Sequence, residues 1–223
     1  MKKKSSIERH REFYLNLVSQ NSVNWKLIDS IYGQLTLAWL NAPQDATQLN
    51  LINALQSHQE KRGLWQDQLK WAQKGLEVAT LNESKQDIVI LLQGIGRVNL
   101  LQGNYMKSLE YLQRSLGLYN ELDDYTGTVT AYCDIAQVHL NKGNFQEALE
   151  YIQRALSFVK DQDVSLLTGR VFYMLANTYL GLEQYIQALD YDQQALDIYE
   201  KLNHHAGLGD VLNDIGLIYA RQY

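Results

Sequence analysis

A pattern that returns every 40 residues constrains the fold of this 223-residue chain more than any other feature. Residues 143–156, GNFQEALEYIQRAL, keep the frame of residues 103–116, GNYMKSLEYLQRSL, and residues 183–196, EQYIQALDYDQQAL, keep it again. Residues 63–76 retain the aromatic and leucine spacing with different polar residues, and we count them as a divergent fourth copy. Self-similarity at a period of about 20 to 50 residues is typical of arrays whose units stack on their neighbours.

Each copy is predicted to form two helices, because apolar residues recur three and four positions apart on both sides of a short turn. In the middle copy the first helix carries Tyr132, Ile135, Ala136 and Val138, and the second carries Phe145, Ala148, Leu149, Ile152, Ala155 and Leu156. One hairpin of this kind has an apolar face that only the next hairpin can cover. The sequence therefore predicts an all-α fold of stacked antiparallel helical hairpins.

Small residues and turn residues support this prediction. Ala148 and Ala155 are expected where helices cross, because small side chains let two backbones approach closely. Gly143 suits the left-handed conformation that ends a helix. Ser84 and Asp87 form a pattern similar to a capping box, which predicts the start of a helix.

Composition narrows the class of protein. With 46% hydrophobic and 20% charged residues, the chain is too apolar to be disordered, and its longest aliphatic run, at 88–92, is far below the roughly 20 residues that span a bilayer. The basic start at 1–6 has no apolar stretch behind it and is not expected to act as a secretory signal. Cys133 is the only cysteine, and Pro43 the only proline. We expect a cytoplasmic helical protein without a disulfide framework or membrane contact.

These residues resemble the tetratricopeptide repeat (TPR) family. The matching pairs in the first helices are Ile95-Gly96, Ile135-Ala136, Leu175-Ala176 and Ile215-Gly216. The usual TPR period is about 34 residues with a closing proline, whereas the 40-residue period resembles the subgroup that includes kinesin light chain and bacterial signalling proteins. The resemblance implies a right-handed TPR α-solenoid over residues 80–223, with repeats at about 87–126, 127–166 and 167–206 and a partial repeat at 207–223.

Residues 1–79 match the repeat less well and are predicted to form divergent helical hairpins. Apolar residues mark one helix around 13–18 and another from Trp25 to Trp39, with a turn at 21–24 between them. Together with the pattern at 62–65, the second helix resembles the segment that joins the ATPase core to the TPR sensor in STAND-type signalling ATPases. The chain has no GxxxxGK[ST] motif, so this resemblance implies a sensor without its motor.

In TPR arrays the first helices line a concave groove, and the resemblance implies a peptide-binding groove here. The residues expected to face it are Gln93, Arg97, Cys133, Asp134, Gln137, Asn141, Arg170, Tyr173, Asn177, Asn213 and Asp214. Amide side chains can bind the backbone of an extended peptide, and the two arginines can bind carboxylates. The alternative is that these residues are only the polar surface that any helix shows to water.

Catalytic and cofactor sites are not expected. Cys133 and His139 lie six residues apart on one predicted helix, which turns their side chains roughly 240° from each other. His204 and His205 are adjacent and lack the ligand spacing of a zinc site, so no metal is expected. The pair Gly94 and Gly96 lies inside a predicted helix, where the backbone amides are not free to bind phosphate. We therefore predict a non-catalytic interaction module without a cofactor.

The sequence indicates the chemical class of the binding partner but not its identity. The net charge of −5 disfavours nucleic acid, and the recurrence of Tyr111, Tyr151 and Tyr191 at one repeat position indicates packing rather than base stacking. We expect a protein or peptide ligand. The alternative is a scaffold that forms homo-oligomers, because the first-helix pattern at 212–219 stays apolar; that helix is expected to be either the cut end of a longer array or covered by a neighbouring molecule.

Overall fold

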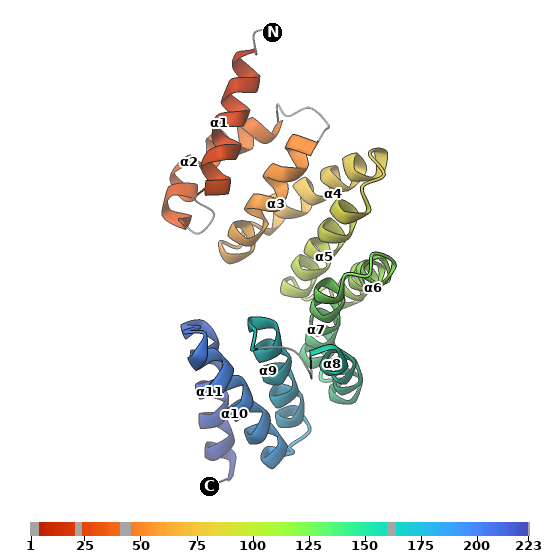
Figure 1. Ribbon diagram of the computed structural model, residues 1–223, viewed down its shortest axis with the longest axis vertical. Helices are drawn as coiled ribbons and strands as arrows, with labels where there is room; N and C mark the ends of the chain where they lie inside the picture. The colour runs from red at the N-terminus through yellow and green to blue at the C-terminus, as the bar shows by residue number, and fades with distance from the viewer. Residues whose placement is uncertain (1–4, 21–23, 41–45, 160–163, 223) are drawn as a thin grey trace. The chain divides into compact units, whose positions relative to one another are not determined.

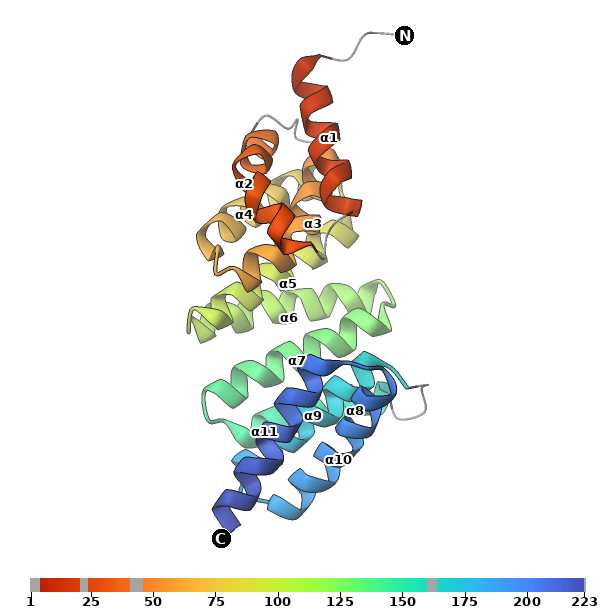
Figure 2. The same ribbon diagram turned by 90° about the vertical axis from the view of Figure 1, so that its left-hand side faces the viewer.

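The computed structural model describes residues 5–20, 24–40, 46–159 and 164–222, and this part of the chain contains eleven helices and no strand (Figures 1 and 2). Pro43, Tyr223, most of the basic N-terminus and most of the predicted turn at 21–24 lie outside the described residues. The helices are α1 (Ser6–Gln20), α2 (Trp25–Leu40), α3 (Ala46–Lys61), α4 (Trp65–Leu81), α5 (Lys85–Leu101), α6 (Tyr105–Glu121), α7 (Tyr125–Asn141), α8 (Phe145–Val159), α9 (Leu166–Gly181), α10 (Tyr185–Lys201) and α11 (His205–Gln222). The prediction of an all-α fold of helical hairpins is confirmed.

The chain divides into two compact units, residues 1–102 with α1–α5 and residues 103–223 with α6–α11. In the first unit α3 packs on α4, α4 on α5, and α1 on both α2 and α3. The buried ring of Trp71 stacks with two other rings of this unit, Trp39 at 4.8 Å and Tyr32 at 6.1 Å between ring centroids. The domain boundary that the sequence suggested after residue 79 lies near the end of α4, inside this unit, and stays a prediction.

In the second unit each helix packs against the next along the chain, and the first helices also touch one another, α7 with α9 and α9 with α11. Figures 1 and 2 show α9, α10 and α11 as neighbours at the C-terminal end. The buried core between α7, α8 and α9 includes Cys133, Ile152, Ala155 and Met174. Ala148 and Ala155 are fully buried, as the repeat pattern predicted. This stacking is the solenoid arrangement that the 40-residue period requires.

Side chains at the helix starts explain several helix boundaries. The hydroxyl of Ser84 accepts a hydrogen bond from the backbone N–H of Asp87 at 3.4 Å, which confirms the predicted cap of α5. At the start of α7, the carboxylate of Asp124 accepts a hydrogen bond from the Gly127 N–H at 2.8 Å. Such contacts satisfy backbone donors that the first turn of a helix leaves without a partner.

The turns inside the hairpins place one residue in the left-handed backbone region. Gly103 and Gly143 take φ angles of +74° and +75°, as predicted, and Glu183 takes +60° at the same repeat position. Glycine adopts this conformation without steric cost, whereas a residue with a Cβ is strained there. The third hairpin of the series therefore closes with a less favourable residue than the first two.

Two tyrosines pack at one repeat position on glycines of the following helix. Tyr119 and Tyr199 are each 5% exposed. A Cβ atom added to Gly127 would lie 2.1 Å from the ring of Tyr119, and one added to Gly207 would lie 2.6 Å from the ring of Tyr199. These close contacts place both rings between successive helices. Of the tyrosines that the sequence predicted to pack, Tyr151 and Tyr191 lie against the buried core between α7, α8 and α9.

Candidate functional site

The first helices of the second unit place mostly polar residues of the same repeat position on neighbouring helices. Because α7 contacts α9 and α9 contacts α11, residues 40 apart on these helices form short rows. The rows are Thr130, Arg170 and Asp210; Cys133, Tyr173 and Asn213; Asp134, Met174 and Asp214; and Gln137, Asn177 and Leu217. Most of the side chains expected to line a groove belong to these rows.

A charge pair joins α7 to α9. Nη2 of Arg170 donates a hydrogen bond to Oδ1 of Asp134 at 2.6 Å, and the side chains are 30% and 3% exposed. Burial lowers the pKa of the Arg170 guanidinium, but the charge and the hydrogen bond of Asp134, together with Cys133 and Tyr199, raise it by more, so the pKa is raised overall. The charge of Arg170 is thus already compensated within the protein, and Asp134 acts mainly as its buried partner.

Cys133 lies in the core between α7, α8 and α9 and is fully buried with a free thiol. Burial raises the pKa of this thiol to about 12. A thiol with such a pKa is not a nucleophile at neutral pH, and its side chain offers no surface to a ligand in this conformation. Its expected place on the groove surface corresponds in the structure to a packing position.

A second polar group joins α9 to α11. Oδ1 of Asp214 accepts a hydrogen bond from Nδ2 of Asn213 at 3.4 Å, and Asn177 donates one to the Tyr173 carbonyl at 3.1 Å. The side chains of Tyr173 and Asn177 also lie close enough to the Asp214 carboxyl to lower its pKa. Burial raises the pKa of Asp214 against the effect of these hydrogen bonds. Burial also raises the pKa of Tyr173 to about 12, and the charges of Asp214 and Asp210 add to this shift. Four of the predicted groove residues are therefore brought together here.

The remaining predicted residues lie apart from this group. Gln137 donates a hydrogen bond to the side chain of Asn141 at 2.8 Å near the end of α7, and Asn141 is exposed. Gln93 and Arg97 lie on α5 in the first compact unit, and both are half-buried. The eleven predicted residues thus fall into a group of four on α9 and α11, the Asp134–Arg170 ion pair, the buried Cys133, a pair on α7, and two residues of the other unit.

Asp192 of α10 is not among the predicted site residues, and it is fully buried beside Asp214. Burial raises the pKa of its carboxyl to about 7, and the nearby charge of Asp214 adds to the shift. The same repeat position holds Leu112 and Ile152 in the two preceding hairpins, and both are fully buried. Alignment of the repeats could therefore have predicted a buried carboxyl at Asp192, since the earlier copies bury an aliphatic side chain at this position.

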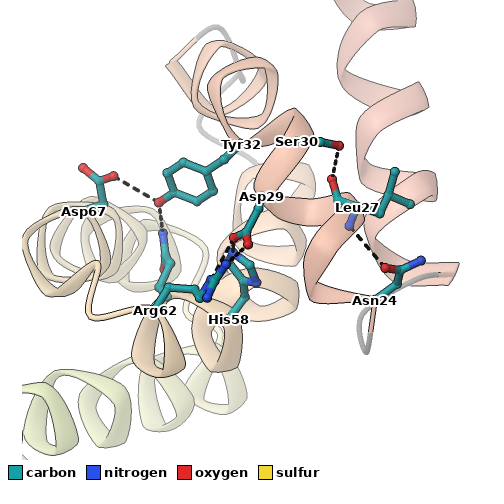
Figure 3. Close-up of polar contacts among 9 residues, drawn as sticks. Asn24, Leu27, Asp29, Ser30, Tyr32, His58, Arg62 and Asp67 are labelled. Atoms are coloured by element: carbon teal, nitrogen blue, oxygen red, sulfur yellow. Dashed lines mark hydrogen bonds and ion pairs between the residues drawn. The ribbon is translucent and has the colours of Figure 1, made fainter.

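A separate polar cluster lies in the first unit between α2 and α3, and Figure 3 shows its side chains and their polar contacts. Arg62 forms a two-point ion pair with Asp29, with Nε 3.0 Å from Oδ1, and its guanidinium lies 4.7 Å from the centre of the Trp25 ring. Nε2 of His58 lies 3.1 Å from Oδ1 of Asp29, and burial lowers the pKa of this imidazole.

The hydroxyl of Tyr32 extends this cluster to α4 (Figure 3). It donates a hydrogen bond to Oδ2 of Asp67 at 3.0 Å and accepts one from Nε2 of Gln59 at 3.0 Å. Burial raises the pKa of Tyr32, so the hydroxyl stays protonated as a donor. These contacts hold α2, α3 and α4 together in the part of the chain where the sequence repeat is divergent.

The fold and the rows of polar residues define a helical-repeat interaction module. A model of the tetratricopeptide repeat matches residues 86–161 and 167–222, and the chain belongs to this family. The sequence matches no curated protein. No helix in the described part of the chain is long and apolar enough to cross a membrane.

Solved structures with the same fold come from several kinds of protein. A protein described as a kinesin light chain of Podosopora anserina, with nearly identical TPR-like repeats, is 13% identical, with a TM-score of 0.71 over 91% of this chain and 100% of that one. A Rap protein in complex with Competence and Sporulation Factor is 16% identical, with a TM-score of 0.79 over 100% of this chain and 62% of that one.

A third structure is a Signal Transduction ATPase with Numerous Domains from Pyrococcus horikoshii, which has a tetratricopeptide repeat sensor. It is 15% identical, with a TM-score of 0.73 over 95% of this chain and 34% of that one. At these identities the likeness concerns the fold. It confirms the TPR solenoid fold that the sequence indicated.

Proposed function

We propose that this chain is a non-catalytic module that binds a peptide or an extended protein segment along α7, α9 and α11. The observation that supports this most is the group of Tyr173, Asn177, Asn213 and Asp214, which two stacked helices hold together. A surface ordered before binding loses little conformational entropy when the ligand arrives. Amide and hydroxyl groups in such a surface can pair with peptide N–H and C=O groups.

The Rap protein supports this proposal by analogy, because it has the same fold and its structure is a complex with Competence and Sporulation Factor. The STAND protein, whose repeats are described as a sensor, supports a finer version in which this chain is the sensor part of a larger signalling protein. The buried, free Cys133 fits the cytoplasmic location that we also propose. The net charge of −5 supports a protein ligand over nucleic acid.

A random peptide library displayed on phage tests the binding proposal. Peptides selected on the immobilised chain are synthesised with a fluorophore, and their affinities are measured by anisotropy. We expect Asn177→Ala combined with Asn213→Ala to weaken binding about tenfold, since each amide contributes one or two hydrogen bonds. Arg170 is left in place because its removal would also uncover the buried carboxylate of Asp134.

Gln153→Ala is the matched control, because Gln153 is an exposed amide on a second helix, α8. Equal affinities of the wild type, the double variant and the control would place the binding surface elsewhere on the chain. Melting temperatures measured by circular dichroism show whether each variant is folded.

A second candidate function is self-assembly through α11. Leu212, Leu217 and Tyr219 of this helix are 56%, 44% and 51% exposed, which supports a covered interface between copies. Light scattering over a concentration series tests this scaffold function. Growth of the molar mass with concentration, abolished by Leu212→Asn with Leu217→Asn, is the expected result, and a constant monomer mass would contradict it.

A further inference from the structure

The pairing of Asp134 with Arg170 shows how this array satisfies an acid at one position of the first helix. Asp214 occupies the same repeat position as Asp134, two repeats later, and is 7% exposed. Asp134 receives a guanidinium from the next first helix at 2.6 Å. Among the described residues no basic side chain pairs with Asp214, whose Oδ2 atom has no hydrogen-bond partner.

A position on the neighbouring helix α10 also changes from an apolar residue to an acid between one repeat and the next. In the preceding repeat Ile152 and Met174 belong to one buried apolar cluster. Forty residues later the corresponding residues are Asp192 and Asp214. Both oxygens of Asp192 are buried without a hydrogen-bond partner in the described part of the chain. Two carboxyl groups with three oxygens that lack donors thus replace an apolar contact.

The charges around this pair of carboxyls are also negative. Asp210, one turn earlier on α11, is exposed and acts electrostatically on both Tyr173 and Asp214. Arg170, the basic residue of α9, is held by Asp134. Buried carboxylates without donors are costly unless a cation or a proton joins them. The group therefore favours a positively charged hydrogen-bond donor over an anion or an apolar side chain.

We propose that the groove binds a cationic nitrogen group of its ligand at Asp214, in the way that Arg170 binds Asp134 within the protein. The inference rests on the proposed function and names the ligand as a basic peptide. Asp210 and Asn213 form the exposed rim of the site, and the buried Asp192 of α10 interacts electrostatically with Asp214. The cation is a guanidinium or an ammonium, and an ammonium belongs either to a lysine side chain or to a free amino terminus.

The test uses random peptides on phage, selected in parallel on the wild-type chain, on Asp214→Asn and on Asp192→Leu. We expect the wild type to enrich arginine or lysine at one position of the selected peptides. Asp214→Asn should lose this preference and keep the preferences at other positions. Asp197→Asn is the control, because it removes an exposed carboxylate of α10 at a distance from the groove position.

Synthetic peptides identify the cation without any change in the protein. Replacing the selected arginine by citrulline, or the selected lysine by norleucine, should raise the dissociation constant roughly tenfold or more, since a charge-assisted hydrogen bond is lost. The same replacement should have little effect with Asp214→Asn. Acetylated and free amino termini are compared to separate a side-chain cation from a terminal one.

The outcomes separate this inference from the proposed function. Selected peptides that depend on Asn177 and Asn213 but carry no preferred cation would overturn the inference and leave the peptide groove standing. A chain that selects no peptide would overturn both. A neutral replacement that weakens binding equally to the wild type and to folded Asp214→Asn would show that the cation binds elsewhere.

Discussion

Asp192 and Ile152 occupy the same position of successive repeats, and both side chains are fully buried. An apolar residue at this position contributes to the core, whereas an acid without a partner loses its hydration. We predict that Asp192→Leu raises the free energy of unfolding by about 1 to 3 kcal/mol. Chemical denaturation measures this change, with Asp190→Asn on the exposed side of α10 as the control. A less stable Asp192→Leu protein would contradict the burial of this carboxyl.

The stability of the chain should depend on pH through the same residue. The folded-state pKa of Asp192 is raised to about 7 from an ordinary value of 3.8. The folded state binds the proton of the Asp192 carboxyl more tightly than the unfolded state does. The contribution of Asp192 to the free energy of unfolding is therefore most favourable below pH 4 and is lost as the pH rises to about 7.

Asp214 acts in the same direction, since its pKa is also raised. His58 acts in the opposite direction, because its pKa is lowered and acid destabilises its folded form. Denaturation of the wild type and of Asp192→Leu between pH 4 and 8 isolates the contribution of Asp192 to the pH dependence of stability. The stability difference between them should widen by a few kcal/mol, roughly, as the pH rises. A difference that stays constant over this range would show that Asp192 does not bind a proton differently in the two states.

Glu183 should be replaceable by glycine with a gain in stability. It adopts a φ of +60° where Gly103 and Gly143 take +74° and +75°. Removing the Cβ relieves the strain of a left-handed backbone, so Glu183→Gly should stabilise the chain by about 0.5 to 1 kcal/mol. The reverse change, Gly143→Glu, should destabilise by a similar amount. Thermal melting followed by circular dichroism measures both, and a loss of stability in Glu183→Gly would contradict the turn geometry.

The ion pair between α7 and α9 should show strong coupling. Arg170→Ala leaves the buried Asp134 carboxylate without its cation and should cost roughly 3 kcal/mol or more. Arg170→Met together with Asp134→Leu removes both charges and should recover most of that loss. A double-mutant cycle measures the coupling, and additive effects of the two single changes would mean that the pair does not act as a unit.

The fold could be predicted because each repeat contains the local features that specify a helical hairpin. The apolar spacing, the buried Ala148 and the left-handed Gly143 are local features that any single copy displays. The cap by Ser84 is equally local. Recurrence at one period multiplied these signals and fixed the register of the hairpins.

The site could be predicted only in part, because burial of polar residues depends on partners far away in the chain. Asp134 was expected on the groove surface, but its carboxylate is buried because Arg170, 36 residues later, reaches it. The grouping of Tyr173, Asn177 and Asp214 depends on how α11 packs on α9, which spacing alone does not give. In the first unit His58 contacts Asp29 across two helices that do not follow the repeat. The sequence pattern therefore could not predict this contact.

Backbone amide chemical shifts, recorded while a library-selected peptide is titrated into the labelled chain, test the central claim most directly. The account predicts that the largest changes lie on α9 and α11, at Tyr173, Asn177 and Asn213, with smaller ones on α7. Exposed apolar residues of the second helices, Met106 and Ile186, should not shift. Changes centred on those two residues, with α9 and α11 unaffected, would contradict the proposed groove.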